Sequence, residues 1–196
     1  ADDLPRIDEL DSTGELPATH ELPANIESCA TDELPDSEDL VGLATAIGAR
    51  LLAKNWQVTV AESCTGGGAA YVLTSVPGSS AWFEEGFVVY ANQVKERRLQ
   101  VPATLLAAHG AVSEPVVLAM AAGAAAASGA ECALAISGIA GPSGGVPGKP
   151  VGTVCFGWQV GGRADAATCH FPGNRRQVRL RAIRQGLQGL LKRLAI

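Results

Sequence analysis

Segments with the periodicity of a helix alternate with short apolar segments from residue 37 to the end of this 196-residue chain. The predicted helices cover residues 37–55, 92–100 and 174–195. A further helix follows residues 62–68 and ends at about residue 74, a short one follows residue 102, and an alanine-rich one opens at residues 113–115. The predicted strands cover residues 56–61, 86–90, 132–137, 151–160 and 164–171, and Gly161-Gly162 marks a hairpin between the last two. Such helices pack on both faces of a sheet. We therefore expect an α/β fold, a three-layer α/β/α sandwich on a mixed, mostly parallel sheet.

The first 36 residues differ from the rest because they repeat a Leu-Pro step. The step occurs at residues 4–5, 16–17, 22–23 and 34–35, mostly after an acidic residue. Proline excludes a regular helix, and so few apolar side chains cannot offset the entropy cost of ordering the segment. We predict that residues 1–36 form a leader that is disordered or draped over the body, with leucines able to dock on this chain or a neighbour. Residues 37–196 are predicted to form the folded domain, with Ser37 as the first N-cap.

Charge separates the leader from the body. Residues 1–39 hold thirteen acidic residues and one basic residue, a net charge of −12. Residues 40–196 hold seven acidic and fourteen basic residues, a net charge of +7. A cationic body raises the local concentration of anionic ligands, although solubility alone accounts for the same charge.

The cysteines and the apolar stretches of the sequence indicate the cellular compartment of the protein. Five cysteines are present with no CxxC pair and no metal-like spacing, so we expect reduced thiols. No signal peptide is apparent, and the longest uncharged stretch, residues 115–130, is too short and too weakly hydrophobic to span a bilayer. We therefore predict a cytoplasmic protein.

Three polar segments are the candidates for a functional site, and each follows a predicted strand. They are residues 62–68, 90–95 and 137–145. Strand ends in an open α/β sheet gather at the edge where ligands bind. The first segment opens a helix, whose N–H groups suit a phosphate or a developing oxyanion. The third offers further N–H groups for a carboxamide or a phosphate.

A serine nucleophile is one interpretation of the first two segments. Ser63 becomes nucleophilic only when a base takes its proton, and Lys95 can do so if its pKa is lowered by burial or by nearby positive charge. Tyr90 can relay the proton or steer the lysine. Simpler interpretations stay open, in which Ser63 and Thr65 cap a helix, Lys95 is solvated, and residues 138–150 are a flexible connector.

Other candidate groups have less support. Cys64 lies beside Ser63 and is a second candidate nucleophile, but no sequence spacing links a histidine to it as a base. The histidines at positions 20, 109 and 170 are scattered, which argues against a Ser-His-Asp triad and against a histidine metal site. The basic side of the last helix has few aromatic neighbours, so we expect it to be solvated rather than to bind nucleic acid. Arg175, near the start of this helix, can reach a phosphate instead.

Seven sequence blocks, in order from about residue 37 to the end, resemble the C-terminal domain of the CinA family. They are residues 60–67, 76–80, 90–95, 109–113, 137–145, 149–154 and 171–175. The resemblance implies a nicotinamide-nucleotide amidase, which converts nicotinamide mononucleotide and water to nicotinate mononucleotide and ammonia. It also implies that Ser63 is the nucleophile and that Tyr90 and Lys95 activate it. The leader is no part of this pattern, and the N-terminal molybdopterin-binding-like domain of larger family members is not seen in this sequence.

The mechanism that follows from this resemblance uses no metal and no redox cofactor. Neutral Lys95 accepts the proton of Ser63 as the serine attacks the carboxamide, and N–H groups near residues 65–67 or 138–141 stabilise the oxyanion. The residues predicted to bind the substrate are Glu62, Thr65, Gly66, Gly67, Asn92, Ser137, Gly138, Ala140, Gly141 and Arg175. Which of the two glycine loops holds the phosphate stays open.

Two other functions fit the same sequence. One is a non-catalytic nucleotide sensor with the same pocket, and the other is an interaction module whose acidic leader and basic last helix recruit partners or DNA. For the enzyme, we expect a small-molecule nucleotide substrate, no membrane and no nucleic acid. We also expect a homo-oligomer, a dimer or larger, in which the leader can contact a neighbour.

Overall fold

The computed structural model describes residues 34–195, so the leader predicted over residues 1–36 lies almost wholly outside the described residues. The helices are α1 (Ser37–Lys54), α2 (Gly68–Thr74), α3 (Asn92–Leu99), α4 (Ala103–His109), α5 (Glu114–Ser128) and α6 (Arg175–Leu194), with a short 3-10 turn, η2 (Ser79–Ala81). The strands are β1 (Val58–Glu62), β2 (Phe83–Val88), β3 (Cys132–Gly138), β4 (Thr153–Val160) and β5 (Arg163–His170).

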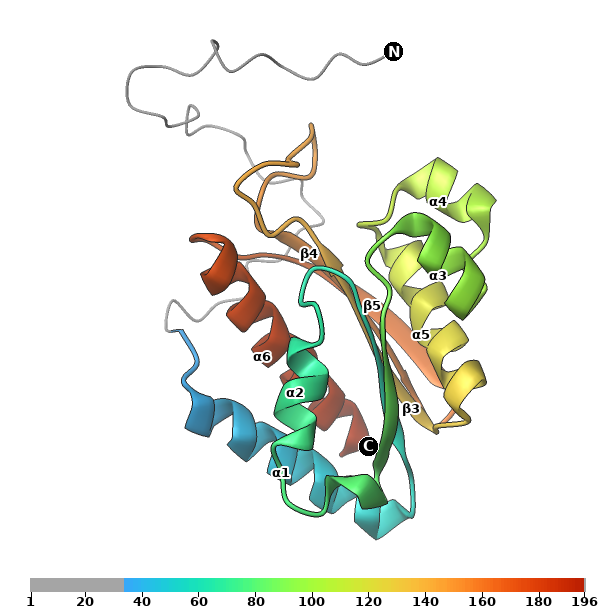
Figure 1. Ribbon diagram of the computed structural model, residues 1–196, viewed down its shortest axis with the longest axis vertical. Coiled ribbons are helices and arrows are strands. Elements are labelled where there is room, and N and C mark those ends of the chain that lie inside the picture. Colours follow the sequence, from blue (N-terminus) through green and yellow to red (C-terminus); the bar gives the residue numbers. More distant parts are fainter. Residues whose placement is uncertain (1–33, 196) are drawn as a thin grey trace.

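The strands form one sheet in the order β2-β1-β3-β4-β5. β1 is parallel to both of its neighbours, and β4 is antiparallel to both of its own, so β4 alone opposes the shared direction of the other strands. Helices α1, α2 and α6 cover one face, and α3, α4 and α5 cover the other (Figure 1). The predicted α/β sandwich on a mixed sheet is confirmed.

The two faces of the sheet have different cores. Beneath α1, α2 and α6 the core holds large side chains such as Trp82, Phe156 and Trp158. Beneath α5 it is made largely of alanine and valine, and this lets the helix approach the sheet closely. At Gly157 of β4 the approach is so close that a Cβ atom would overlap the carbonyl group of Val117. The alanine and glycine content of the chain is therefore a packing requirement on this face.

Several predicted boundaries differ from the structure by one to three residues, and two of them are instructive. The N-cap of α1 is Asp36 rather than Ser37, because the Asp36 carboxylate accepts the N–H of Asp39 and the Asp39 side chain accepts the N–H of Asp36. Strand β2 begins at residue 83 rather than 86. It is an edge strand with mostly exposed or half-buried side chains, so its sequence lacks the alternation that marks a strand with one buried face.

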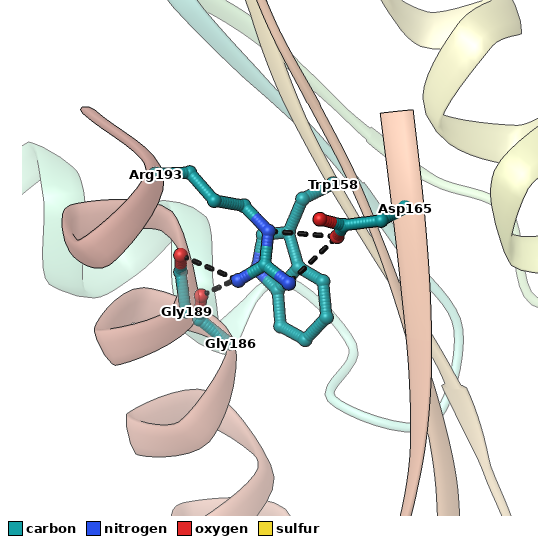
Figure 2. Close-up of polar contacts among 5 residues, drawn as sticks. All are labelled: Trp158, Asp165, Gly186, Gly189 and Arg193. Carbon is teal, nitrogen blue, oxygen red and sulfur yellow. Dashed lines mark hydrogen bonds and ion pairs between the residues drawn. The ribbon is translucent and has the colours of Figure 1, made fainter. Parts of the chain in front are cut away.

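An arginine near the end of α6 fixes this helix to the sheet. The guanidinium of Arg193 lies over the ring of Trp158 at 3.8 Å and pairs with Asp165 of β5 at 2.6 Å (Figure 2). Its third nitrogen donates to the carbonyl of Gly189, and the Trp158 indole donates to that of Gly186 (Figure 2). These contacts set the position of α6, whose first turns reach the opposite end of the sheet.

No helix in the described part of the chain is long and apolar enough to cross a membrane. Among the described cysteines, Cys64, Cys132 and Cys155 are free and buried. Cys169 is disulfide-bonded, which departs from the expectation that all five cysteines are reduced.

Candidate active site

The three predicted segments meet at one edge of the sheet, where β1, β2 and β3 end. Glu62 pairs with Ile136 in register, and the N–H of Ser63 donates to the carbonyl of Ile136 at 2.9 Å. The segment that carries Tyr90 and Lys95 follows β2 on the other side of β1. The parallel pairing of β1 with both neighbours is what brings loops distant in sequence together.

Ser63 and Lys95 lie in direct contact. The Lys95 Nζ atom is 3.3 Å from Ser63 Oγ, 2.9 Å from the carbonyl oxygen of Val89 and 2.8 Å from that of Tyr90. Lys95 is fully buried and Ser63 nearly so. A neutral amine has two N–H groups and one lone pair. The two carbonyls can accept the N–H groups, which leaves the lone pair facing the serine hydroxyl.

The surroundings of Lys95 favour this neutral form. Burial lowers the pKa of Lys95 below the ordinary lysine value of 10.5, because the charged ammonium loses its hydration. Among the described residues, no carboxylate forms an ion pair with Lys95 to offset that loss. The arrangement can therefore take a proton from a serine, which is the requirement for an activated hydroxyl nucleophile.

Glu62 holds the loop that carries Ser63. Its fully buried carboxylate accepts N–H groups from Gly67 at 3.1 Å, Ala69 at 3.1 Å and Ala70 at 2.9 Å. A carboxylate at this position satisfies the free donors of α2 and complements its positive N-terminal end. The predicted substrate contact of Glu62 is thus directed at the protein's own loop.

Few N–H groups in the two glycine loops are left for an oxyanion. The N–H groups of Gly66 and Gly68 donate to the carbonyls of Ser63 and Thr65, and that of Ile139 donates to Thr153. Within the described residues, the N–H groups of these loops that make no hydrogen bond to another residue include those of Cys64, Thr65, Ala140 and Gly141.

Arg175 joins two of the predicted segments. This exposed first residue of α6 donates to the carbonyl of Gly141 at 3.0 Å and to the hydroxyl of Tyr90 at 3.3 Å. The Tyr90 hydroxyl therefore contacts Arg175, and it is the Tyr90 carbonyl that contacts Lys95. Tyr90 steers the lysine through its main chain rather than through its phenol.

Arg179 is a site residue that the sequence analysis did not single out. Its guanidinium donates to the carbonyl of Thr65 at 2.7 Å, across 114 residues of sequence. The available signal was helical spacing, because Arg179 lies four residues after Arg175 and so on the same face of α6. Part of the basic side of α6 therefore contacts the loop that carries Ser63 and Thr65.

The remaining predicted residues lie at the same edge in different settings. Ser137 is buried and donates to the carbonyl of Ala111 at 2.8 Å, while Asn92 is exposed at the first residue of α3. Gly138 pairs with Val154 at the end of β3, and Ala140 is buried.

Burial raises the pKa of the Cys64 thiol to about 12, so this neighbour of Ser63 stays protonated at neutral pH.

Residues 41–194 match the CinA C-terminal domain family. The chain belongs to this family. Its relatives include the nicotinamide-nucleotide amidohydrolase PncC of Pseudomonas putida, which is 52% identical over 155 residues, or 79% of this chain and 97% of that protein. PncC of Escherichia coli (strain K12) is 50% identical over 159 residues, or 80% of this chain and 95% of that protein.

Solved CinA superfamily structures have the same fold. The protein from Klebsiella pneumoniae 700603 superposes with a TM-score of 0.77 at 39% identity, covering 80% of this chain and 98% of its own. The Escherichia coli protein gives a TM-score of 0.78 at 38% identity, covering 82% and 93%. The resemblance of the seven sequence blocks to the CinA C-terminal domain is confirmed.

Proposed function

We propose that this protein is a nicotinamide-nucleotide amidohydrolase, which converts nicotinamide mononucleotide and water to nicotinate mononucleotide and ammonia. Relatives of that name are 50–52% identical and are covered over 92% or more of their length. The observation that carries the chemistry is the 3.3 Å contact between Ser63 Oγ and the buried Lys95 Nζ.

In the first half of the reaction, the amine of Lys95 takes the hydroxyl proton as Ser63 Oγ bonds to the carboxamide carbon. The carbonyl oxygen gains the negative charge, and we assign its stabilisation to the N–H groups of Cys64 and Thr65, which follow Ser63 in the chain and make no hydrogen bond to another residue. The Lys95 ammonium then gives its proton to the amide nitrogen. The C–N bond breaks and ammonia leaves, with the acyl group on Ser63.

In the second half, water attacks the acyl group on Ser63. Lys95, neutral again after the first half, accepts a proton from this water and returns it to Ser63 Oγ. The products are nicotinate mononucleotide and the regenerated serine. Every proton thus passes through one amine, held by the carbonyls of Val89 and Tyr90.

We infer the orientation of the substrate from which hydrogen-bond donors at this edge already have a partner in the protein. The N-terminus of α2 is satisfied by the carboxylate of Glu62, so it is a poor place for a phosphate. Arg175 is exposed, cationic and within reach of both Tyr90 and Gly141. We assign the phosphate to Arg175 and the carboxamide to the Ser63 side.

The deciding experiment is to incubate the purified protein with nicotinamide mononucleotide and to measure ammonia and nicotinate mononucleotide together. Equal amounts of both products are expected. Substrate-induced thermal stabilisation with neither product would instead indicate a non-catalytic nucleotide sensor.

The cytoplasm is the proposed location, because a charged nucleotide does not cross a bilayer unaided. The proposed homo-oligomer is tested by light scattering of the purified chain, and a monomer at assay concentration would contradict it.

A further inference from the structure

A groove of about 610 Å³ lies between α1, α2 and α6, beside the nucleophile loop. Its walls are mostly apolar and are lined by Leu40, Val41, Val72, Leu180 and Ile183. Two cationic side chains, Arg176 and Arg179, stand on the α6 side. An apolar groove beside two arginines is suited to a segment that combines apolar side chains with an acid.

The chain itself enters the fold at this groove. Pro35 and Asp36 are among its lining residues, and Pro35 is buried. Leu34, the residue before, is 37% exposed. The C-terminal end of the leader is therefore joined to the folded domain beside this groove.

The sequence repeats the motif found beside the groove. An acidic residue followed by Leu-Pro occurs at residues 3–5, 15–17, 21–23 and 33–35. The described part of the last copy, Leu34-Pro35, already meets the groove through its proline. Residues 1–33 carry ten acidic residues and one basic residue, a net charge of −9, against the arginines of α6.

We propose that the acid-Leu-Pro copy at residues 21–23 of the same chain docks in this groove. Leu22 and Pro23 cover the apolar wall, and Glu21 faces Arg176 and Arg179. The ten residues between Pro23 and Leu34 span at most about 33–36 Å when extended, which keeps this copy within that distance of Leu34. This copy is favoured over those at residues 3–5 and 15–17 because a shorter loop costs less entropy to close.

Docking there reaches the catalytic edge through Arg179. The same guanidinium donates to the carbonyl of Thr65, in the loop between Ser63 and α2, and Gly68 of α2 lines the groove. The groove is thus an attachment surface for the leader, next to the loop that positions the nucleophile.

Limited proteolysis of the full chain with a glutamate-specific protease tests the docking, with each cut followed by mass spectrometry. Leader sites are available at Glu9, Glu15, Glu21 and Glu27. Cleavage after Glu21 should be at least tenfold slower than after Glu9. In the Leu22→Ser variant the two rates should become equal, whereas Leu10→Ser, at a leucine with no proline after it, should leave the protection of Glu21 intact.

The groove side is tested with a matched charge reversal on one helix. Arg176→Glu should remove the protection of Glu21, and Lys192→Glu, at an exposed residue in the last turn of α6, should not. Equal cleavage after Glu9 and Glu21 in the wild-type chain would overturn the proposal. Protection that disappears on dilution, together with a dimer in light scattering, would also overturn it by placing a neighbour's leader in the groove.

Discussion

At the scale of single residues, the proposed chemistry depends on one proton that moves between Ser63 and Lys95. Replacing Ser63 by alanine removes the atom that bonds to the carboxamide carbon, so turnover should fall by roughly 10⁴-fold or more. Binding of the nucleotide should persist, measured by the thermal shift that the substrate induces. Cys64→Ala is the matched control, because that thiol is protonated and its loss should leave ammonia release near normal. Near-normal turnover in Ser63→Ala would exclude the serine route.

The charge state of Lys95 predicts the pH dependence. Only the neutral amine accepts the serine proton, and burial lowers the pKa of Lys95 below 10.5. The value of kcat/KM should therefore rise with pH through this lowered pKa, and level off at a lower pH than it would with an exposed lysine as the base. Lys95→Met and Lys95→Arg should both be inactive at every pH, since arginine stays charged. A flat profile for the wild-type protein from pH 6 to 10 would contradict this role.

Glu62 is predicted to act on the nucleophile through the loop. Glu62→Gln keeps the shape of the side chain but turns an NH₂ group toward N–H donors. The cost should be about 1.5–3 kcal/mol of unfolding free energy, the range for hydrogen bonds to a charged group. Because the substrate is held elsewhere, kcat should fall more than KM rises. Glu84→Gln, on the exposed edge strand, is the control, and a loss confined to KM would instead make Glu62 a substrate ligand.

At the scale of elements, α6 is held at one end and presents arginines at the other. Arg193→Ala removes the stacking on Trp158 and the pair with Asp165, and we expect a loss of about 1–2 kcal/mol in urea unfolding. Arg193 is eighteen residues, or about 27 Å of helix, from Arg175, so KM should stay unchanged. Lys192→Ala, exposed in the same turn, should have little effect on either quantity. An increase in KM without loss of stability would show that the far end of α6 takes part in binding.

The elements that the sequence predicted well are those with a strong local pattern. Helix α6 has a long apolar stripe that includes Leu187, Leu190 and Leu194, and β3 is buried along nearly its whole length. The sequence pattern places the start of the edge strand β2 three residues late, because every side chain of this strand is exposed or only half-buried. Periodicity reports burial, so it is weakest where an element is half solvated.

The site was only partly predictable for a related reason. The proximity of Ser63 and Lys95 followed from the expectation that strand ends share one edge, together with the CinA resemblance. The contact of Arg179 with Thr65 and the triple hydrogen bond of Glu62 depend on how α6 and α2 pack on the sheet. Side-chain direction after packing is not encoded in residue type or spacing, so these roles were not foreseen.

At the scale of the whole molecule, the sign of the net charge depends on the leader. The complete chain carries −5, whereas residues 34–196 hold ten acidic and fourteen basic residues, a net charge of +4. Arg175 and Arg179 of α6 contact the loops at the edge that carries Ser63, and the groove proposed for the leader includes Arg176 and Arg179. Acidic residues near this edge would oppose the approach of a phosphate-bearing substrate.

Removing residues 1–33 should therefore raise kcat/KM for nicotinamide mononucleotide at low ionic strength, mainly by lowering KM. The family match begins at residue 41, so the shortened chain keeps the whole matched domain. The Debye length falls from about 30 Å at 0.01 M salt to about 3 Å at 1 M, so the two proteins should converge as salt is added. Steady-state kinetics across that range measures the effect, with kcat as the internal control because it reports the bound complex. A difference in KM that persists at high salt would mean that the leader obstructs the site physically, and equal KM values at low salt would mean that its charge does not reach the substrate.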